Sequence, residues 1–291
     1  MNQRTILFIA FAFLLACSGG KPDAGDNPSV TVSILPQKYF VEQIAGSTVD
    51  VNVMIPPGAS PATYEPSPSQ LEKLSRSELY FRVGHIGFES AWMDRMQKVN
   101  PAMDVVDLSE GIDLIGHGHH AGSHDRHHHG GINPHIWLAP STVKKLSGTI
   151  TDRLAERFPE EEGRFRENMR SFEKKLDSLD RYIRSELQEL DSRSFFIYHP
   201  SLAYYARDYN LEQVPMELEG KSPSSAYLKN LADQGKEKEI GVIFLQMQFD
   251  QHNAEVLARE TGAEIVQINP LDPDWYEQMI AITDKLTMHL Q

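Results

Sequence analysis

Cysteine is almost absent from this chain of 291 residues, because Cys17 is the only one. A single cysteine excludes an intramolecular disulfide and a zinc site built from several thiolates. We also expect no cysteine nucleophile, because this one thiol lies at the end of the signal-like segment described below. Positive charge is also scarce, with 28 Lys and Arg against 41 Asp and Glu and a formal net charge of −13. Nucleic acid is therefore not an expected partner, since phosphate recognition needs a basic surface.

Long apolar runs are missing as well. The longest, Ile6 to Ala16, follows Arg4 and is too short to span a bilayer as a stable helix. It ends in Leu14-Leu15-Ala16-Cys17, which resembles a bacterial lipoprotein signal. The resemblance implies that residues 1–17 are a lipoprotein signal, cleaved before Cys17, with lipidation of Cys17 and an extracytoplasmic (periplasmic) protein anchored to the membrane. Residues 18–28, rich in Gly, Pro and Asp, predict a flexible tether.

Histidine, in contrast, is concentrated in one segment. Seven of the twelve histidines fall within the loop 116–130: His117, His119, His120, His124, His127, His128 and His129. Neutral imidazole is a ligand that Zn²⁺, Cu²⁺ and Ni²⁺ prefer, and many imidazoles on a Gly/Ser-rich segment collect such ions weakly. A solvated loop or a purification tag is the alternative, but the segment is internal and interrupted by Gly, Ser, Asp and Arg. We therefore predict a weak metal-capture loop.

The remaining sequence alternates short apolar strands with helices, which predicts parallel sheets covered on both faces. The predicted strands are Val30–Leu35, Val49–Ile55, Leu79–Val83, Val105–Leu108, Phe195–His199, Ile240–Gln246 and Glu264–Ile268. The predicted helices begin at Pro36 and span about Pro68–Ser77, Ser201–Tyr209 and Asn253–Thr261. The predicted fold class is α/β, with two small lobes at residues 29–158 and 192–291.

One long amphipathic helix is predicted between the lobes, at residues 159–191. Its apolar positions recur at intervals of three and four: Phe165, Met169, Phe172, Leu176, Leu179, Ile183, Leu187 and Leu190. This pattern predicts about thirty helical residues and a length of about 45 Å. A coiled-coil dimerisation helix would share the pattern. We favour a rigid linker in a monomer, with the ligand in the cleft at the carboxyl ends of the strands.

Three histidines stand at positions suited to metal binding. His199 ends a predicted strand and precedes Pro200, His135 lies in Asn133-Pro134-His135-Ile136-Trp137, and His85 follows a predicted strand between glycines. Imidazoles from three separate loops would give Zn²⁺ three nitrogen ligands, with carboxylate, amide or water at the fourth position. Each histidine could instead be a hydrogen-bonded polar residue at a lobe edge.

Several spaced motifs, together with these histidines, resemble the cluster A-I solute-binding proteins of bacterial ABC transporters, in particular the zinc branch. The motifs that carry the resemblance are Pro56–Pro66, Asn133–Leu138, Tyr198-His199 with Tyr204–Ala206, Glu217–Ser224, and Gln248–Asp250 through Glu260–Ala263. The His-rich insertion before the second motif is typical of that branch. The resemblance implies capture of Zn²⁺, or less favourably Mn²⁺, and delivery to an ABC permease.

Two positions depart from the family pattern. Ala62 occupies the place of the usual first-loop histidine, and Asn269 that of a frequent aspartate. We expect His85 to supply the missing imidazole, and a nitrogen-rich site should disfavour hard Mn²⁺. Asn269, Glu65 and Gln246 are lower-ranked candidates for a ligand or an outer-shell support.

Two other functional classes remain open from the residues alone. Three histidines and a bound water also make a zinc hydrolase or hydratase site, although the candidate bases Glu65 and Glu89 carry no catalytic motif. A surface adhesin with structural metal is the third class. We predict that the protein is not an enzyme. Retention of a permease domain in a pull-down would support transport, whereas zinc-dependent turnover of ester or CO₂ substrates would support an enzyme.

Overall fold

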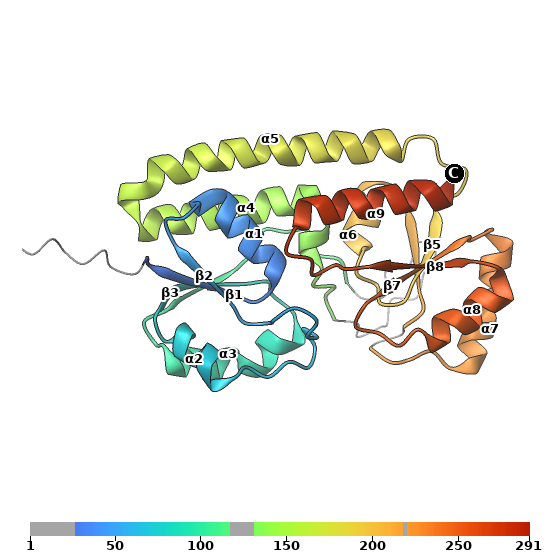
Figure 1. Cartoon of the computed structure of the whole chain (residues 1–291), viewed down its shortest axis with the longest axis horizontal. Coiled ribbons are helices and arrows are strands. Elements are labelled where there is room, and N and C mark those ends of the chain that lie inside the picture. Colours follow the sequence, from blue (N-terminus) through green and yellow to red (C-terminus); the bar gives the residue numbers. More distant parts are fainter. Residues whose placement is uncertain (1–26, 117–130, 218–219) are drawn as a thin grey trace, which may run out of the picture.

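The structure is a computed structural model that describes residues 27–116, 131–217 and 220–291. Cys17, most of the predicted tether and the seven clustered histidines lie outside these residues. The described residues form two parallel-sheet α/β lobes joined by a long helix, as predicted (Figure 1). Among them, no helix combines the length and apolarity needed to cross a membrane.

The first lobe contains a four-stranded parallel sheet in the order β2-β1-β3-β4. Its strands are β1 (Ser29–Val32), β2 (Asp50–Val53), β3 (Ser77–Arg82) and β4 (Asp104–Asp107). Its helices are α1 (Leu35–Ala45), α2 (Pro68–Leu74) and α3 (Gly87–Val99). Helix α1 lies on one face of the sheet, and α2 and α3 lie on the other (Figure 1). Helices on both faces explain why most residues of the central strands β1 and β3 are buried.

The second lobe repeats the same strand order as β6-β5-β7-β8. Its strands are β5 (Ser194–Ile197), β6 (Glu212–Pro215), β7 (Val242–Gln246) and β8 (Glu264–Ile268). Its helices are α6 (Ala203–Asp208), α7 (Ser225–Glu237), α8 (His252–Thr261) and α9 (Trp275–Leu290). Figure 1 shows the strands of each lobe ending toward the other lobe. Residues that follow strands in the two lobes therefore face a common region.

The two lobes are connected through η1 (Ile136–Leu138), α4 (Pro140–Arg157), η2 (Pro159–Glu161) and α5 (Glu162–Glu186). Helix α5 is the predicted linker, but it is shorter than the predicted span of residues 159–191. Its carboxyl end is fixed by Arg193, whose guanidinium donates hydrogen bonds to the carbonyls of Leu187 and Gln188 at 3.2 and 3.3 Å. A side chain that satisfies these terminal carbonyls ends the helix before Leu190.

One hydrophobic core extends through both lobes, and the second lobe has a further, smaller cluster that includes Phe196 and Ile243. A single buried cluster contains Val30 and Phe81 of the first lobe and Phe195 and Phe244 of the second. Helix α9 completes this cluster, because Trp275 packs edge-on against Phe40 of α1 with ring centroids 5.1 Å apart. The area buried by α9 and α5 therefore ties the lobes together.

Two tryptophans add hydrogen bonds to that connection. The indole of Trp137 donates to the carbonyl of Pro270 at 2.8 Å, and the indole of Trp275 donates to the carbonyl of Trp137 at 2.7 Å. All three residues are buried. The segment that follows His135 is thus held by the second lobe as well as by its own.

Candidate metal centre

Two of the three predicted histidine ligands come together between the lobes. His135 immediately precedes η1, and His199 lies two residues beyond the end of β5. Their ring centroids are 5.0 Å apart, and the ring planes meet at 70°. His135 is buried, whereas the His199 side chain is 29% exposed, so the pair lies at the edge of solvent.

Asn133 fixes the orientation of His135. Its Oδ1 accepts hydrogen bonds from the backbone N–H of His135 at 3.1 Å and from Nδ1 of the ring at 2.8 Å. Its Nδ2 donates to the carbonyl of Pro200 at 2.9 Å. The oxygen and the nitrogen of this buried amide thereby link the His135 ring to Pro200, the residue that follows His199.

His199 has its own set of supports from the second lobe. Its Nδ1 lies 3.0 Å from Oε2 of buried Glu217, and Phe249 stacks on the imidazole with centroids 5.3 Å apart. Gln246 accepts from the His199 backbone N–H at 3.2 Å and donates to its carbonyl at 2.6 Å and to Ser201 Oγ at 2.9 Å. Gln246 therefore supports the His199 loop.

These contacts select one tautomer of each ring. The amide oxygen of Asn133 and the carboxylate of Glu217 accept hydrogen bonds, so each Nδ1 carries the proton. The lone pair of each neutral imidazole is then on Nε2. Metal-binding histidines in proteins have this arrangement, in which an outer-shell acceptor fixes the tautomer and strengthens the ligand.

His85 is placed differently. Its side chain is exposed, its φ of 64° is in the left-handed region, and among the described residues it makes no hydrogen bond, ion pair or ring contact. The described part of the chain contains no group of three His, Cys, Asp or Glu side chains arranged to hold a metal. The structure therefore pairs His135 with His199 and leaves His85 outside that pair.

The turn that contains His85 nevertheless packs against the loop that contains Ala62. The backbone N–H of Phe88 donates to the carbonyl of Pro61 at 2.8 Å. A Cβ added to Gly87 would lie 2.8 Å from the Ala62 carbonyl oxygen, so glycine is needed for this close approach. The two segments that sequence analysis related to each other are in direct contact.

The other candidate residues have local structural contacts or none. Glu65 is exposed and, within the described residues, has no hydrogen bond or ion pair. The amide of Asn269 donates to Asp272 at 3.0 Å and accepts from the backbone of Leu271 at 3.3 Å, which shapes the loop after β8. The capture-loop histidines and Cys17 lie outside the described residues.

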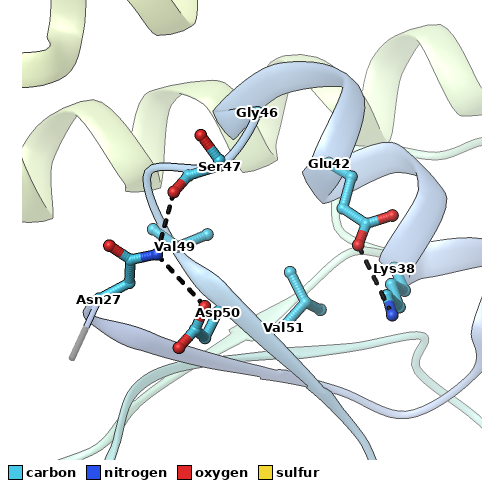
Figure 2. A pocket seen from close by; sticks show the side chains of 8 residues that line it. All are labelled: Asn27, Lys38, Glu42, Gly46, Ser47, Val49, Asp50 and Val51. Carbon is cyan, nitrogen blue, oxygen red and sulfur yellow. Dashed lines mark hydrogen bonds and ion pairs between the residues drawn. The ribbon is translucent and has the colours of Figure 1, made fainter.

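Two cavities lie away from the histidine pair. One of about 570 Å³ is lined by Asn27, Asp50 and Lys38, among others, near the amino ends of β1 and β2 (Figure 2). There Asn27, inside the predicted tether, donates to Ser47 and Asp50, so the ordered lobe begins before Ser29. The second, of about 350 Å³, includes Tyr39 and Tyr276. Ligands of open α/β sheets bind at the opposite, carboxyl edge.

Sequence analysis assigned no role to Asn133 or Glu217. Asn133 had one local signal, because it lies two residues before His135 in Asn-Pro-His. Glu217 lies after β6, a strand that was not predicted because it is short, polar and ends in Pro215, as edge strands do. Its contact with His199 joins residues far apart along the chain.

Comparison with known proteins gives a consistent result. Residues 30–288 match the family described as "ZnuA: Zinc-uptake complex component A periplasmic". Zinc-binding lipoprotein AdcA of Streptococcus pneumoniae is 29% identical over 269 residues, covering 89% of this chain and 53% of AdcA. High-affinity zinc uptake system protein ZnuA of Bacillus subtilis is 28% identical over 287 residues, covering 92% and 88%. This chain thus spans about half the length of AdcA.

The solved structures include a close match in fold. The crystal structure of a zinc-bound ZnuA deletion mutant aligns with a TM-score of 0.84 and 38% identity, covering 91% of this chain and 99% of that one. The family match includes both lobes, the linker helix and the His135–His199 pair. The family is that of an uptake component and not of an enzyme. The chain belongs to the ZnuA family of periplasmic zinc-uptake components.

Proposed function

We propose that this protein is an extracytoplasmic solute-binding protein that captures Zn²⁺ between its lobes and delivers it to an ABC permease. The observation that carries the proposal is the His135–His199 pair, with both Nδ1 atoms hydrogen-bonded and the lone pairs on Nε2. Hydrogen bonding at Nδ1 leaves Nε2 as the metal-binding nitrogen of each ring. The ZnuA-family match supports the transport role.

The donor chemistry supports zinc over manganese. Two imidazoles form the pair, and the nearby Glu217 is bonded to His199 Nδ1. Neutral nitrogen donors suit borderline ions such as Zn²⁺, whereas Mn²⁺ favours carboxylate and carbonyl oxygen. Zn²⁺ is the cargo in this proposal, and Mn²⁺ is a weaker competitor.

We propose His85 as the third ligand. The support is the packing of its Gly84–Gly87 turn against Pro61 and Ala62, where the family resemblance places a ligand loop. Ala62 has only a methyl group, which cannot bind metal. His85 is exposed, belongs to the neighbouring turn of the same lobe and has no hydrogen bond, ion pair or ring contact among the described residues, so its imidazole is open to a cation.

The proposal extends to two segments outside the described residues. The seven histidines of the loop 116–130 would collect Zn²⁺ weakly near the site. The bridge between Gly116 and Ile132 supports this idea, because it joins the two ends of the loop just before Asn133. Cys17 would hold the protein at the membrane through a lipid, as the name of the AdcA lipoprotein suggests for that relative.

A zinc titration of the chain without residues 1–17 tests the binding proposal. We expect one tight Zn²⁺ per chain by competition calorimetry, lost in the double variant His135→Ala/His199→Ala, and much weaker Mn²⁺ binding. Unchanged zinc affinity in the double variant would overturn the site. Co-purification of the zinc-loaded lipoprotein with the permease in a membrane extract tests delivery, and an equal yield with a permease that lacks its external loops would contradict it.

A further inference from the structure

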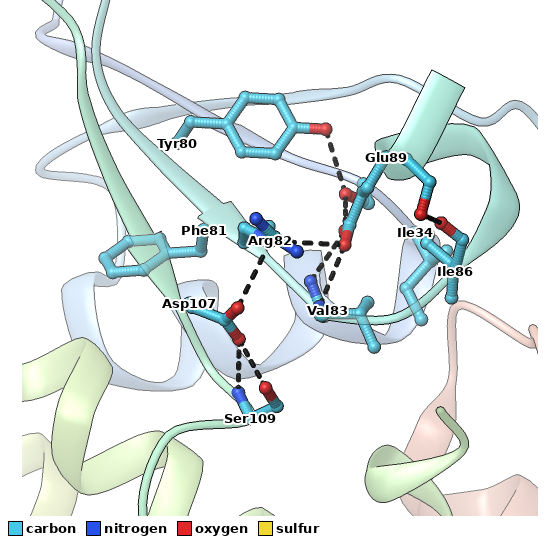
Figure 3. A network of polar contacts seen from close by, with 12 residues as sticks. Ile34, Tyr80, Phe81, Arg82, Val83, Ile86, Glu89, Asp107 and Ser109 are labelled. Atoms are coloured by element: carbon cyan, nitrogen blue, oxygen red, sulfur yellow. Dashed lines mark hydrogen bonds and ion pairs between the residues drawn. The ribbon is translucent and has the colours of Figure 1, made fainter. Parts of the chain in front are cut away.

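A buried carboxylate lies behind the turn that contains His85. Glu89, in the first turn of α3, is 1% exposed and accepts hydrogen bonds from the backbone N–H groups of Val83 at 2.7 Å and Gly84 at 2.8 Å. The hydroxyl of Ser33 also donates to it. Figure 3 shows Glu89 reaching back from α3 to the end of β3. This carboxylate therefore holds the backbone immediately before His85.

The same turn is confined from its other side. Arg82 Nε lies 3.6 Å from Glu89 and 3.3 Å from Asp107, and Asp107 accepts from the Ser109 backbone and hydroxyl (Figure 3). A Cβ added to Gly84 would lie 2.5 Å from Ser109 Oγ. Gly84 is therefore fixed between the Glu89 carboxylate and the Asp107–Ser109 pair.

This confinement coincides with backbone strain. Gly84 has φ 85° and His85 has φ 64°, so two consecutive residues are in the left-handed region. For a residue with a side chain, that conformation is unfavourable and persists only where the surrounding structure enforces it. His85 itself makes no polar contact among the described residues, so its own side chain does not hold it there.

We propose that Glu89 is a positioning residue that holds the Gly84–His85 turn in its strained form and so directs the His85 imidazole to the bound cation. The proposal rests on the proposed role of His85 as a zinc ligand. Without the carboxylate, the buried N–H groups of Val83 and Gly84 lose their acceptor. The turn can then relax out of the left-handed region, which would change the direction in which the imidazole leaves the backbone.

A double-mutant cycle tests the coupling. We expect Glu89→Ala to weaken zinc binding by about 10–100-fold, the range for loss of an outer-shell support, and to have no further effect in the His85→Ala background. An equal loss in both backgrounds would assign Glu89 a general structural role and overturn the proposal. If His85→Ala weakens binding and Glu89→Ala does not, the positioning role alone fails.

The third-ligand assignment has a separate outcome. Unchanged affinity in His85→Ala would overturn that assignment and the positioning role together, while the His135–His199 pair would remain testable by its own double variant. Ala62→His in the Glu89→Ala background gives a converse result. It should restore affinity if the lost function is one imidazole at this position, and no recovery would contradict that explanation.

Two control variants distinguish loss of positioning from a general loss of protein stability. Asn100 is buried in the same lobe and donates to the carbonyls of Leu74 and Ser77 at 3.1 and 2.7 Å, without touching the His85 turn. Asn100→Ala should lower stability and leave zinc affinity unchanged. Glu89→Gln retains one oxygen acceptor and should recover part of the affinity lost in Glu89→Ala. Equal weakening in Asn100→Ala and Glu89→Ala would overturn the proposal.

Discussion

The two lobes have the same strand order, but the loops that follow β3 and β5 hold His85 and His199 in different ways. In the second lobe, Glu217 and Phe249 contact the His199 ring itself. In the first lobe, Glu89 bonds to the backbone before His85, and the imidazole is exposed. A histidine can thus be oriented through contacts to its ring or through contacts to the backbone of its turn.

This difference predicts a division of labour. His135 and His199 are oriented before the cation arrives, so little conformational entropy is lost when they bind it. His85 has side-chain freedom to lose, so its net contribution to affinity should be smaller.

The largest effect is expected from the oriented pair. His199→Ala should weaken tight zinc binding by more than about 100-fold, since even outer-shell losses cost about 10–100-fold, and His85→Ala should have a smaller effect. Competition calorimetry measures both. His252→Ala, at an exposed position in α8, is the matched control and should bind normally. A greater loss in His85→Ala than in His199→Ala would reverse the ranking.

The next effect concerns the ring contact in the second lobe. Glu217→Gln keeps the size of the side chain but removes the anion that accepts from His199 Nδ1, so zinc affinity should fall by about 10-fold or more. Glu237→Gln, exposed on α7, serves as the control. If both variants bind zinc as the parent does, the carboxylate does not tune this ligand.

The next prediction concerns how the stability of the protein depends on pH through Glu89, the buried carboxyl group of the first lobe. Burial raises the pKa of Glu89 from 4.5 to about 7, against hydrogen bonds from Ser33, Val83 and Gly84 that lower it. Because the folded pKa lies above the unfolded value, its stabilising contribution is complete below about pH 4.5 and is lost as pH rises through about 7. Between pH 5 and pH 8 this amounts to about 2 kcal/mol.

Urea unfolding of the metal-free protein at the two pH values measures that contribution. The parent should lose more stability toward pH 8 than Glu89→Gln, whose amide does not titrate. The difference between the two slopes isolates Glu89 from the other titrating groups. Parallel slopes would show that the carboxyl has the same pKa folded and unfolded.

The smallest effect on the tight site is expected from the capture loop. Replacing residues 117–130 with a short Gly/Ser linker removes the seven histidines while leaving enough chain to close the Gly116–Ile132 bridge and leaving the Asn133 contacts in place. Weak zinc binding should disappear and the tight site should retain its affinity, as measured by stoichiometry in a calorimetric titration. Loss of the tight site would mean that the loop supplies one of its ligands.

Local patterns predicted much of this molecule. The parallel lobes and the linker helix followed from apolar periodicity, which depends on residues near in sequence. Helices α3, α4, α7 and α9 and strand β6 were not predicted. Helix α9 is an example, because its apolar residues pack against α1 and α5, which are distant from it in the sequence.

The candidate site shows the same limit. His135 and His199 follow strands or sit among bulky apolar residues, so their positions could be read locally. The Asn133–Pro200 and His199–Glu217 contacts join segments distant in sequence, and neither could be inferred without the fold. The sequence also could not show that the described residues contain no group of three metal-binding side chains. The exposure of His85 depends on its left-handed backbone conformation, which the sequence pattern does not specify.

The packing of Trp275 has a consequence for the timing of folding. Its indole fills the aromatic cluster of Phe40 and Tyr39 in the first lobe, although it comes from the far end of the sequence. Contacts between such distant residues form late, because the chain between them must first be brought together. During translation, the core of the first lobe therefore stays incomplete until α9 has been synthesised. Until then the apolar surface of that lobe is accessible to export factors and chaperones.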